Sequence, residues 1–366
     1  MTEAIHDLQS AVSGLTGTIE PGAEPLTLGL GECTLRLRSN SKELIDTLRQ
    51  YFSHVVVQTV ASPNLEVIAI ERDSPELGIK FIDWKREPGK VGRKDAYYDL
   101  PQARLVKKVR TGMVFLQSDS LCIAAGPCVN CDNQVINFIN AQYMNWLQQR
   151  DWLICHASGL VFNGRTLGIA GFSGGGKSTL MLHMLDDKRV SYLTNDRLFI
   201  SRQNGRIDAA GIPKLPRINP GTIVHNPTLH PLISQLEREQ LLKLPAEELW
   251  YLEDKYDVHI DQIYGVGRIV PEAPLNAFLV LNWKRDSDAA LAVERVDLAV
   301  RRDLLGAIMK SPGPFYQYSD GNFFQDTTEL EPLSYLDVLK DIPVYEASGG
   351  VDFAALTQIC FQELMN

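Results

Sequence analysis

The 366-residue sequence has no long hydrophobic run and no large cluster of basic residues. No stretch approaches the roughly 18 apolar residues of a membrane span, so we expect no membrane partner. Residues 1–7 carry neither the basic nor the apolar part of a secretory signal, and we therefore expect a cytoplasmic protein. The net charge of −9 disfavours a nucleic-acid partner, because affinity for phosphodiesters depends on clustered lysine and arginine.

Cysteine is also scarce. Six cysteines in a chain of this length do not form a disulfide framework. Cys128 and Cys131 make one C-x-x-C pair, with Cys122 upstream. A structural zinc site usually needs two such pairs, and the sequence holds no second one. We interpret these cysteines as loop residues without metal or redox chemistry.

Against these absences stands a complete phosphate-binding loop, GFSGGGKS, at residues 171–178. The apolar residues 167–170 before it predict a buried strand, and residues 179–185 after it predict a helix. Glycines let backbone N–H groups converge on phosphate oxygens, and the helix N-terminus adds partial positive charge. In such loops the lysine reaches the β- and γ-phosphates and the next hydroxyl holds Mg²⁺. The residues expected to hold the nucleotide are Ser173, Gly174, Gly175, Gly176, Lys177, Ser178 and Thr179.

The chain before the loop predicts a β-hairpin. Asn163-Gly164 lies between the apolar residues 160–162 and 167–170, and Asn-Gly between two apolar runs is a strong hairpin signal. The strand that leads into the phosphate loop is therefore expected to be the second arm of this hairpin.

Asp196 is the main candidate for chemistry beyond the loop. It follows a predicted strand at residues 190–194 and lies 19 residues after Lys177, which allows one helix and a return strand. The carboxylate is then expected at a strand end beside the loop, where α/β proteins bind ligands. There Asp196 could coordinate Mg²⁺ together with Ser178, or accept a proton from a hydroxyl nucleophile.

Two further residues are weaker candidates. His156 precedes the hairpin, where it could contact the γ-phosphate or the acceptor, although an isolated histidine is more often structural. Residues 213–222 hold three prolines and one glycine, which predicts a rigid, extended and exposed loop. Arg217 in that loop could bring a planar charge to the transferred phosphate; the alternative is a structural connection.

The remaining pattern predicts two domains, with residues 1–131 as an N-terminal α+β domain and residues 132–366 as the nucleotide-binding domain. Residues 1–25 are expected to be weakly ordered. The other expected elements are strands at 34–38, 55–57, 65–70, 105–109, 113–116 and 275–283, and helices at 43–51, 132–146, 232–243, 246–255 and 296–310. The apolar run 278–281 ends in Asn282 rather than a carboxylate, which weakens a motor or switch ATPase interpretation.

Taken in order, His156, the Asn163-Gly164 turn, the phosphate loop and Asp196 resemble the C-terminal domain of the HPr kinase/phosphorylase family. The resemblance covers about residues 150–225 and is closest to a divergent, HPr-kinase-related group. It implies an α/β P-loop kinase domain of the HPr kinase and phosphoenolpyruvate carboxykinase type, preceded by a smaller α+β domain. It also implies that Asp196 is the base that takes the proton of an acceptor serine.

One position departs from the family pattern. The family typically has two adjacent aspartates, whereas this sequence has Asn195 before Asp196. Loss of one carboxylate weakens metal binding or the reverse phosphorolysis, so phosphorylase activity is not carried over. The segment around Arg217 stands near the place of the family's signature segment.

Together these residues predict a kinase that uses ATP and Mg²⁺ to phosphorylate a hydroxyl, expected to be a serine, on a protein or small molecule. The catalytic candidates are Asp196, Lys177, His156 and Arg217, and the metal ligands are Ser178 and Asp196. A small protein phosphoacceptor and a homo-oligomer are left open as partners. The alternatives are a metabolite kinase, a nucleotide-gated binding protein with little turnover, and a carboxykinase-like enzyme acting on an oxo-acid. No base-reading motif separates ATP from GTP.

Overall fold

The computed structural model describes residues 5–86, 92–172, 174–252 and 254–365. The chain forms two compact units, residues 1–151 with 311–329 and residues 152–310 with 330–366. This division differs from the expected boundary after residue 131, because helix α3 (Asp132–Gln148) packs on the helix and strands of the first unit. The sequence pattern also gives no sign that residues 311–329 return to the first unit.

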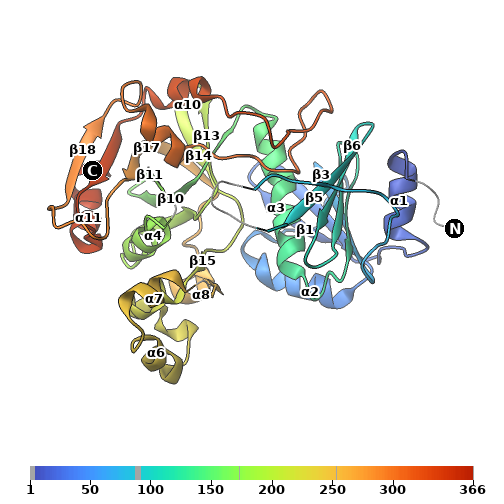
Figure 1. Ribbon diagram of the computed structural model, residues 1–366, viewed down its shortest axis with the longest axis horizontal. Helices are drawn as coiled ribbons and strands as arrows, with labels where there is room; N and C mark the ends of the chain where they lie inside the picture. Colours follow the sequence, from blue (N-terminus) through green and yellow to red (C-terminus); the bar gives the residue numbers. More distant parts are fainter. Residues whose placement is uncertain (1–4, 87–91, 173, 253, 366) are drawn as a thin grey trace. The chain divides into compact units, whose positions relative to one another are not determined.

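The first unit is built on an eight-stranded sheet of order β1-β2-β3-β8-β7-β6-β5-β4 (Figure 1). Its central pairs β2–β3 and β3–β8 are parallel, so the sheet is mixed. The strands are β1 Leu26–Leu30, β2 Cys33–Ser39, β3 Leu65–Glu71, β4 Ile82–Asp83, β5 Asp95–Leu100, β6 Ala103–Lys108, β7 Val114–Ser118 and β8 Cys122–Gly126. The helices besides α3 are α1 Leu8–Thr16, α2 Lys42–Tyr51 and the 3-10 turn η1 Ser53–Val55.

Local sequence signals explain most of these elements. The alternation along β2 buries every second side chain, as predicted. Helix α2 begins where the hydroxyl of Ser41 accepts a hydrogen bond from the Leu44 amide. The expectation of weak order before residue 25 is wrong for residues 8–16, because Asp7 caps α1 and the helix buries Ala11 and Leu15. The strand expected at residues 55–57 is also absent, since Val55 ends a 3-10 turn.

The second unit is built on a nine-stranded sheet that contains the phosphate loop. Its main path is β12-β10-β11-β17-β14-β13-β9, and β19 pairs with both β17 and β18. The pairs β11–β17 and β17–β19 are parallel. The strands are β9 Leu153–Cys155, β10 Ala157–Phe162, β11 Arg165–Gly171, β12 Val190–Thr194, β13 Leu198–Gln203, β14 Arg206–Ala210, β17 Glu272–Leu281, β18 Ala292–Val296 and β19 Val344–Ser348. A separate two-stranded ribbon joins β15 Arg217–Ile218 to β16 Tyr256–Asp257.

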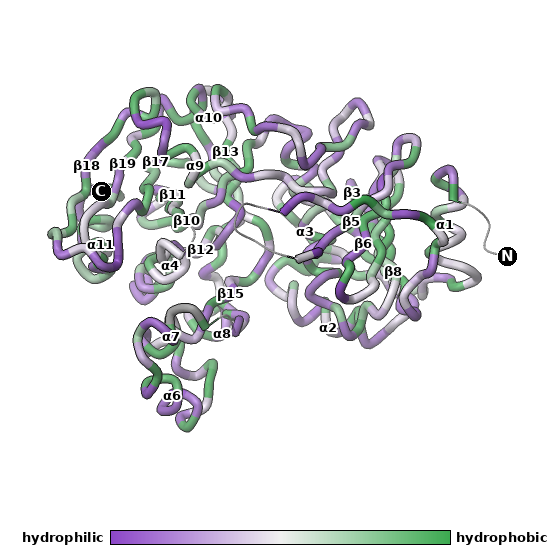
Figure 2. The backbone as a smooth tube through the Cα atoms, viewed as in Figure 1, coloured by the Kyte–Doolittle hydropathy of each residue, from purple (hydrophilic) through white to green (hydrophobic). Residues whose placement is uncertain are grey.

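The predicted hairpin before the loop is confirmed. Strands β10 and β11 pair antiparallel, and Phe162 lies opposite Arg165. Asn163 and Gly164 have φ angles of 52° and 74°, the two left-handed positions that a type I′ turn requires. Both strands are almost entirely buried and appear as apolar segments in Figure 2.

Both faces of this sheet are covered, as parallel strands require. Helix α4 (Lys177–Leu185) packs on one face with Leu160, Ile169 and the C-terminal helix α11 (Phe353–Ile359). On the other face, Phe278 and Val280 pack against α9 (Leu305–Ile308) and α10 (Pro332–Leu339). The remaining helices are α5 Pro220–Val224, η2 Pro227–Leu232, α6 Gln235–Leu241, α7 Ala246–Tyr251, α8 Ile260–Ile263, η3 Arg302–Leu304 and the π-helical turn η4 Cys360–Leu364. In Figure 1, α6, α7 and α8 form a group beyond the ribbon strand β15.

The helix expected over residues 296–310 is mostly absent. Val296 instead ends β18, where it pairs with Val344 of β19. Val300 is 77% exposed, and only residues 302–308 are helical. Among the described residues, no helix is both long and apolar enough to cross a membrane.

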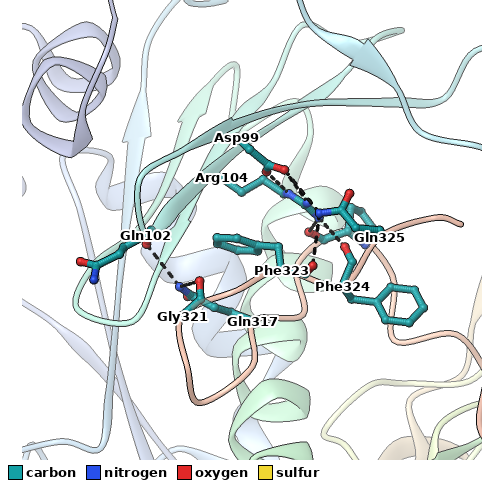
Figure 3. A network of polar contacts seen from close by, with 9 residues as sticks. Asp99, Gln102, Arg104, Gln317, Gly321, Phe323, Phe324 and Gln325 are labelled. Carbon is teal, nitrogen blue, oxygen red and sulfur yellow. Dashed lines mark hydrogen bonds and ion pairs between the residues drawn. The ribbon is translucent and has the colours of Figure 1, made fainter. Parts of the chain in front are cut away.

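Residues 311–329 are tied to the first unit by Arg104 (Figure 3). The Arg104 side chain is fully buried, and its guanidinium lies 2.5 and 2.9 Å from the two carboxylate oxygens of Asp99. It also donates to the carbonyls of Pro314 and Phe324, at 3.2 and 2.8 Å. The ring of Phe323 lies 4.7 Å from the guanidinium carbon. One buried cation therefore satisfies a carboxylate and two backbone carbonyls at once.

We expect the variant Arg104→Leu to lose about 2–4 kcal/mol of the free energy of unfolding of the first unit. The reason is that the carbonyls of Pro314 and Phe324 would lose their charged donor, whereas the Asp99 side chain is 42% exposed, so that water can replace the guanidinium there. Urea denaturation should show the loss, and limited proteolysis should cut within residues 311–329.

The matched control is Arg93→Leu. The ion pair between Arg93 and Asp83 has side chains that are 60% and 53% exposed, so its loss should cost about 0–1 kcal/mol. Equal losses in the two variants would show that the Arg104 network contributes nothing special.

Candidate functional site

The phosphate loop connects the end of β11 at Gly171 to the start of α4 at Lys177, so the strand and helix expected around it are present. Ser173 lies outside the described residues. Gly174 and Gly176 have φ angles of 76° and 85°, a region that side chains rarely adopt. A Cβ atom on Gly176 would also lie 2.7 Å from the Phe353 ring. These positions therefore require glycine.

The first turn of α4 points the charged end of the loop toward the end of β12. The Nζ atom of Lys177 donates a hydrogen bond to the Gly171 carbonyl at 2.9 Å, so the side chain folds back along the loop. Burial lowers the pKa of Lys177, and the negative charge of Asp196 partly opposes that shift. The two residues are thus close enough to influence each other electrostatically.

Asp196 is the centre of a cluster of charged and polar groups. Its Oδ1 atom lies 3.1 Å from Nε2 of His156, and its Oδ2 atom lies 3.9 Å from Nζ of Lys310 and contacts the guanidinium of Arg197. The Asp196 side chain remains 46% exposed. The structure therefore brings together two separately predicted residues, His156 and Asp196, and places two cations beside them.

Sequence reasoning missed both of these cations. Arg197 is adjacent to Asp196 in the sequence and was a detectable candidate. Lys310 carries no local signal, because it reaches the site only through tertiary structure: the His156 amide donates to the Ile308 carbonyl at 2.7 Å. Cys155 and Met309 form an isolated bridge beside that bond.

Hydrogen bonds from neighbouring strands fix the turn that carries Asp196. The Ser158 hydroxyl donates to the backbone carbonyl of Asn195 at 2.5 Å, and the Thr194 hydroxyl donates to the Arg197 carbonyl at 3.0 Å. Asn195, where the related family pattern has an aspartate, thus has its backbone carbonyl engaged with β10.

The charges around Asp196 set its pKa and that of His156. Burial raises the pKa of Asp196, but the charges of Arg197 and Lys310 and the hydrogen bond from His156 outweigh burial and hold it well below its usual value. For His156, the hydrogen bond to Asp196 raises the pKa. Burial and the charges of Lys310 and Lys177 lower it, and together they outweigh the hydrogen bond. The net result is an ionised carboxylate beside a histidine whose pKa lies below 6.5.

Residues 213–222, which were expected to form an exposed loop, are packed against the sheet. Ile212, Leu215 and Ile218 are buried, and the Val258 amide donates to the Pro216 carbonyl at 2.9 Å. A Cβ atom on Gly211 would lie 2.0 Å from the Leu193 carbonyl oxygen. Glycine at this position therefore allows the segment to approach the end of β12.

This packing places Arg217 and Asp196 around one cavity of about 270 Å³. Ser178 from the first turn of α4 also lines it, together with Lys214 and Arg197. Arg217 is 37% exposed, and its Nε atom lies 3.1 Å from Oδ1 of Asp257. Burial, followed by the charge of Arg197, lowers the pKa of Lys214 to about 8. The cavity is therefore rich in positive charge.

The predicted ligands of Mg²⁺ fit this cavity chemically. The Ser178 hydroxyl and the Asp196 carboxylate both line it, and Mg²⁺ prefers oxygen ligands with most positions filled by water and phosphate. No group of three or more His, Cys, Asp or Glu side chains that could hold a metal occurs among the described residues. The Thr179 hydroxyl, expected near the phosphates, lies 3.0 Å from the Thr222 hydroxyl on α5.

The cysteine pair lies in the other unit. Cys128 is buried, and burial raises the pKa of its thiol. Its Sγ atom lies 3.3 Å from the Ile70 carbonyl oxygen. Cys131 is partly exposed and unpaired to any other cysteine.

Comparison with known proteins adds little to this geometry. No family model and no curated protein matches the sequence. Among solved structures, the chain has a weak similarity to the HPr(Ser) kinase/phosphatase from Coxiella burnetii, with 11% identity and a TM-score of 0.27. The match covers 57% of this chain and 88% of that one. A TM-score this low supports no argument about activity, so the site geometry has to carry the functional conclusion.

The pKa of His156 provides a test of the charge cluster. Because Lys310 helps to lower it, the variant Lys310→Met should raise it toward the usual value of about 6.5, as measured by NMR titration of the imidazole. His156→Asn assigns the resonance, and Lys340→Met, which changes an exposed ion pair with Asp337, should leave the titration unchanged.

The same shift has a consequence for stability. A histidine with a lowered native pKa favours the folded state at high pH, and this contribution is lost as the pH falls below about 6.5 toward the native pKa. The loss should be smaller in Lys310→Met. If His156 titrates in Lys310→Met as it does in the wild type, Lys310 does not act on His156.

Proposed function

We propose that this protein is a kinase that uses ATP and Mg²⁺ to transfer the γ-phosphoryl group to a hydroxyl, either a serine of a protein or a hydroxyl of a small molecule. One observation carries the proposal. Ser178, in the first turn of α4, and Asp196, after β12, line the same cavity, so a nucleotide and an acceptor could meet there.

In this proposal the loop and the start of α4 hold the phosphates. The backbone amides of Gly174, Gly176 and Lys177 donate to phosphate oxygens, and the partial positive charge of the helix N-terminus favours the bound anion. The Gly175 amide instead closes the loop, because it donates to the Phe172 carbonyl at 2.9 Å. The ammonium of Lys177 exchanges the Gly171 carbonyl for a β- or γ-phosphate oxygen. A bound phosphate also reverses the effect of burial on Lys177, because a nearby anion stabilises the charged form.

Asp196 orients the acceptor. Its carboxylate accepts a hydrogen bond from the acceptor hydroxyl, whose oxygen then forms a bond to the γ-phosphorus while the bond to the β–γ bridging oxygen breaks. The hydroxyl proton passes to Asp196, and ADP leaves. The low pKa of Asp196 keeps its carboxylate ionised over a wide pH range, so that it can hold the acceptor hydroxyl and accept its proton as the bond to phosphorus forms.

The surrounding cations stabilise the transferred group. Phosphoryl transfer depends mainly on positioning and on neutralisation of the charge on the equatorial oxygens. Arg197, Lys214 and Arg217 line the cavity, and Lys310 lies beside Asp196. In this proposal several cations stabilise the transferred phosphoryl group, whereas the sequence prediction named Arg217 for that role.

Ser178 and Asp196 would hold Mg²⁺, with phosphate oxygens and water as the other ligands. When bound, Mg²⁺ neutralises charge on the β- and γ-phosphates. Asn195 offers a neutral amide where a second carboxylate would strengthen the metal site. This difference favours the forward transfer over phosphorolysis.

A second function is favoured by a different observation. Asp196 is already compensated by Arg197, Lys310 and His156, as in a structural ion-pair cluster. In that case Asp196 has a structural role and no catalytic one. The protein would then bind a nucleotide and change its affinity for a partner, with little turnover.

The nucleotide is tested with Lys177→Ala. Removal of the charge should weaken Mg²⁺–ATP binding at least about tenfold, or about 1.4 kcal/mol, as measured by calorimetry. Lys188→Ala, at an exposed lysine after α4, is the matched control and should bind like the wild type. Unchanged affinity in a folded Lys177→Ala protein would rule out the phosphate loop as the binding site.

Catalysis is tested with Asp196→Asn, which removes a charge and keeps the shape of the side chain. With γ-labelled ATP and fractionated protein and metabolite pools, the wild type should label an acceptor. The variant should bind ATP and transfer phosphate roughly 10²–10⁴-fold more slowly.

The control Asn195→Asp restores the second carboxylate and should raise phosphate-dependent removal of the label. Transfer by Asp196→Asn at the wild-type rate would exclude the proposed mechanism. ATP binding without any labelled acceptor would favour the nucleotide-gated binding protein.

A further inference from the structure

A second cavity, of about 640 Å³, adjoins the phosphate loop at Gly174 and Gly175. Phe172 of the loop and Trp283, just after β17, line it. Ser178, at the other end of the loop, lines the cavity that contains Asp196 instead. The loop therefore connects two separate cavities, and an extended ligand with its phosphates on the loop has room at both ends.

The two cavities differ in charge. The cavity around Asp196 is lined by the cations Arg197, Lys214, Arg217 and Lys255 and by one carboxylate. The larger cavity is lined by two basic residues, Lys284 and Arg285, and two acidic residues, Glu247 and Asp286. The cationic cavity suits phosphate groups, whereas the charge-balanced one suits the uncharged part of a ligand.

Aromatic rings give the larger cavity apolar walls. Phe172 is 43% exposed. The indole N–H of Trp283 donates to the Gly175 carbonyl at 2.9 Å, and its ring packs at 85° against Phe353, with 5.1 Å between centroids. Trp283 is therefore held in place against the phosphate loop itself. Aromatic faces of this kind stack on nucleobases with little preference for one base.

The rim of the cavity is also preformed. The Lys284 amide donates to the Gly349 carbonyl and the Gly350 amide donates to the Ala289 carbonyl, both at 2.9 Å. Gly349 has a φ of 85°, and a Cβ atom there would lie 2.1 Å from the Ala290 carbonyl oxygen. Two loops thus approach as closely as glycine permits and present the exposed Asp286 at the cavity.

We infer that this cavity binds the base and ribose of the nucleotide whose phosphates lie on the loop. The inference rests on the proposed function and extends it, because it gives the nucleotide a direction: the nucleoside at Phe172, Trp283 and Asp286, and the γ-phosphate at Ser178 and Asp196. The aromatic walls contact the faces of the base, and the Asp286 carboxylate accepts hydrogen bonds from its N–H groups or from the ribose hydroxyls. The volume of the larger cavity, about 640 Å³, lies within the usual range for small-molecule sites.

The experiment compares ATP with inorganic tripolyphosphate, which has the phosphates but no nucleoside, by calorimetry on the full chain. Phe172→Ala should bind ATP about five- to 100-fold more weakly than the wild type, because a stacking face is lost. Asp286→Asn should bind ATP about ten- to 100-fold more weakly, because a charged hydrogen-bond acceptor is lost. Both variants should bind tripolyphosphate unchanged. Lys177→Ala should weaken both ligands. Leu333→Ala, which truncates an exposed apolar side chain outside this cavity, should change neither.

Three results would overturn the inference. The first is wild-type ATP affinity in both Phe172→Ala and Asp286→Asn. The second is an equal loss of ATP and tripolyphosphate in these variants, which would show a general effect on the loop. Both leave the proposed kinase intact. If the wild type binds neither ligand, the proposed function fails together with the inference. Asp286→Asn is isosteric and exposed, so folding does not obscure its result.

Discussion

The parallel pairing of β11 with β17 is the interaction on which the site depends. The last paired residues of the two strands are Gly171 and Leu281. Both strands therefore end at the same edge of the sheet, where β11 continues into the phosphate loop and β17 continues toward Trp283. The pairing itself requires glycine, since a Cβ atom on Gly168 would lie 2.8 Å from the Phe278 ring. A rigid, buried strand pair thus sets the position of the loop and of the larger cavity beside it.

The two cavities at that edge of the sheet differ in charge. Cations gather where the loop ends, around Asp196, and the opposite end has balanced charge and aromatic surface. Burial lowers the pKa of Lys177 and Lys214 in the absence of a ligand. In the proposed function, a bound anion would oppose both shifts, and part of its binding energy would come from compensating buried positive charge.

The chain passes from the second unit to the first between Lys310 and residue 311. Residues 311–329 belong to the first unit. Within the first unit, Arg104 holds this segment through Asp99 and two backbone carbonyls. A residue of the charge cluster therefore adjoins, in sequence, a segment whose own anchor lies in the other unit.

The sequence by itself determined the elements whose signals are local. The strand and helix on either side of residues 171–178, the Asn163-Gly164 turn and the strand at residues 190–194 depend on turn geometry and periodicity within a few residues, and the structure contains all of them. His156 and Asp196 were each candidates from the sequence, but their contact is seen only in the structure, where the hairpin and the return strand bring both to one sheet edge.

Only the tertiary structure decided the rest. Lys310 reaches Asp196 through packing of α9 on the sheet, the segment around Arg217 is buried because Gly211 allows close approach, and residues 311–329 belong to the first unit because a buried arginine holds them. These features depend on contacts between residues far apart in the chain. Such contacts leave no periodic or compositional trace in a single sequence, because burial, charge compensation and close backbone approach arise only when the distant segments meet.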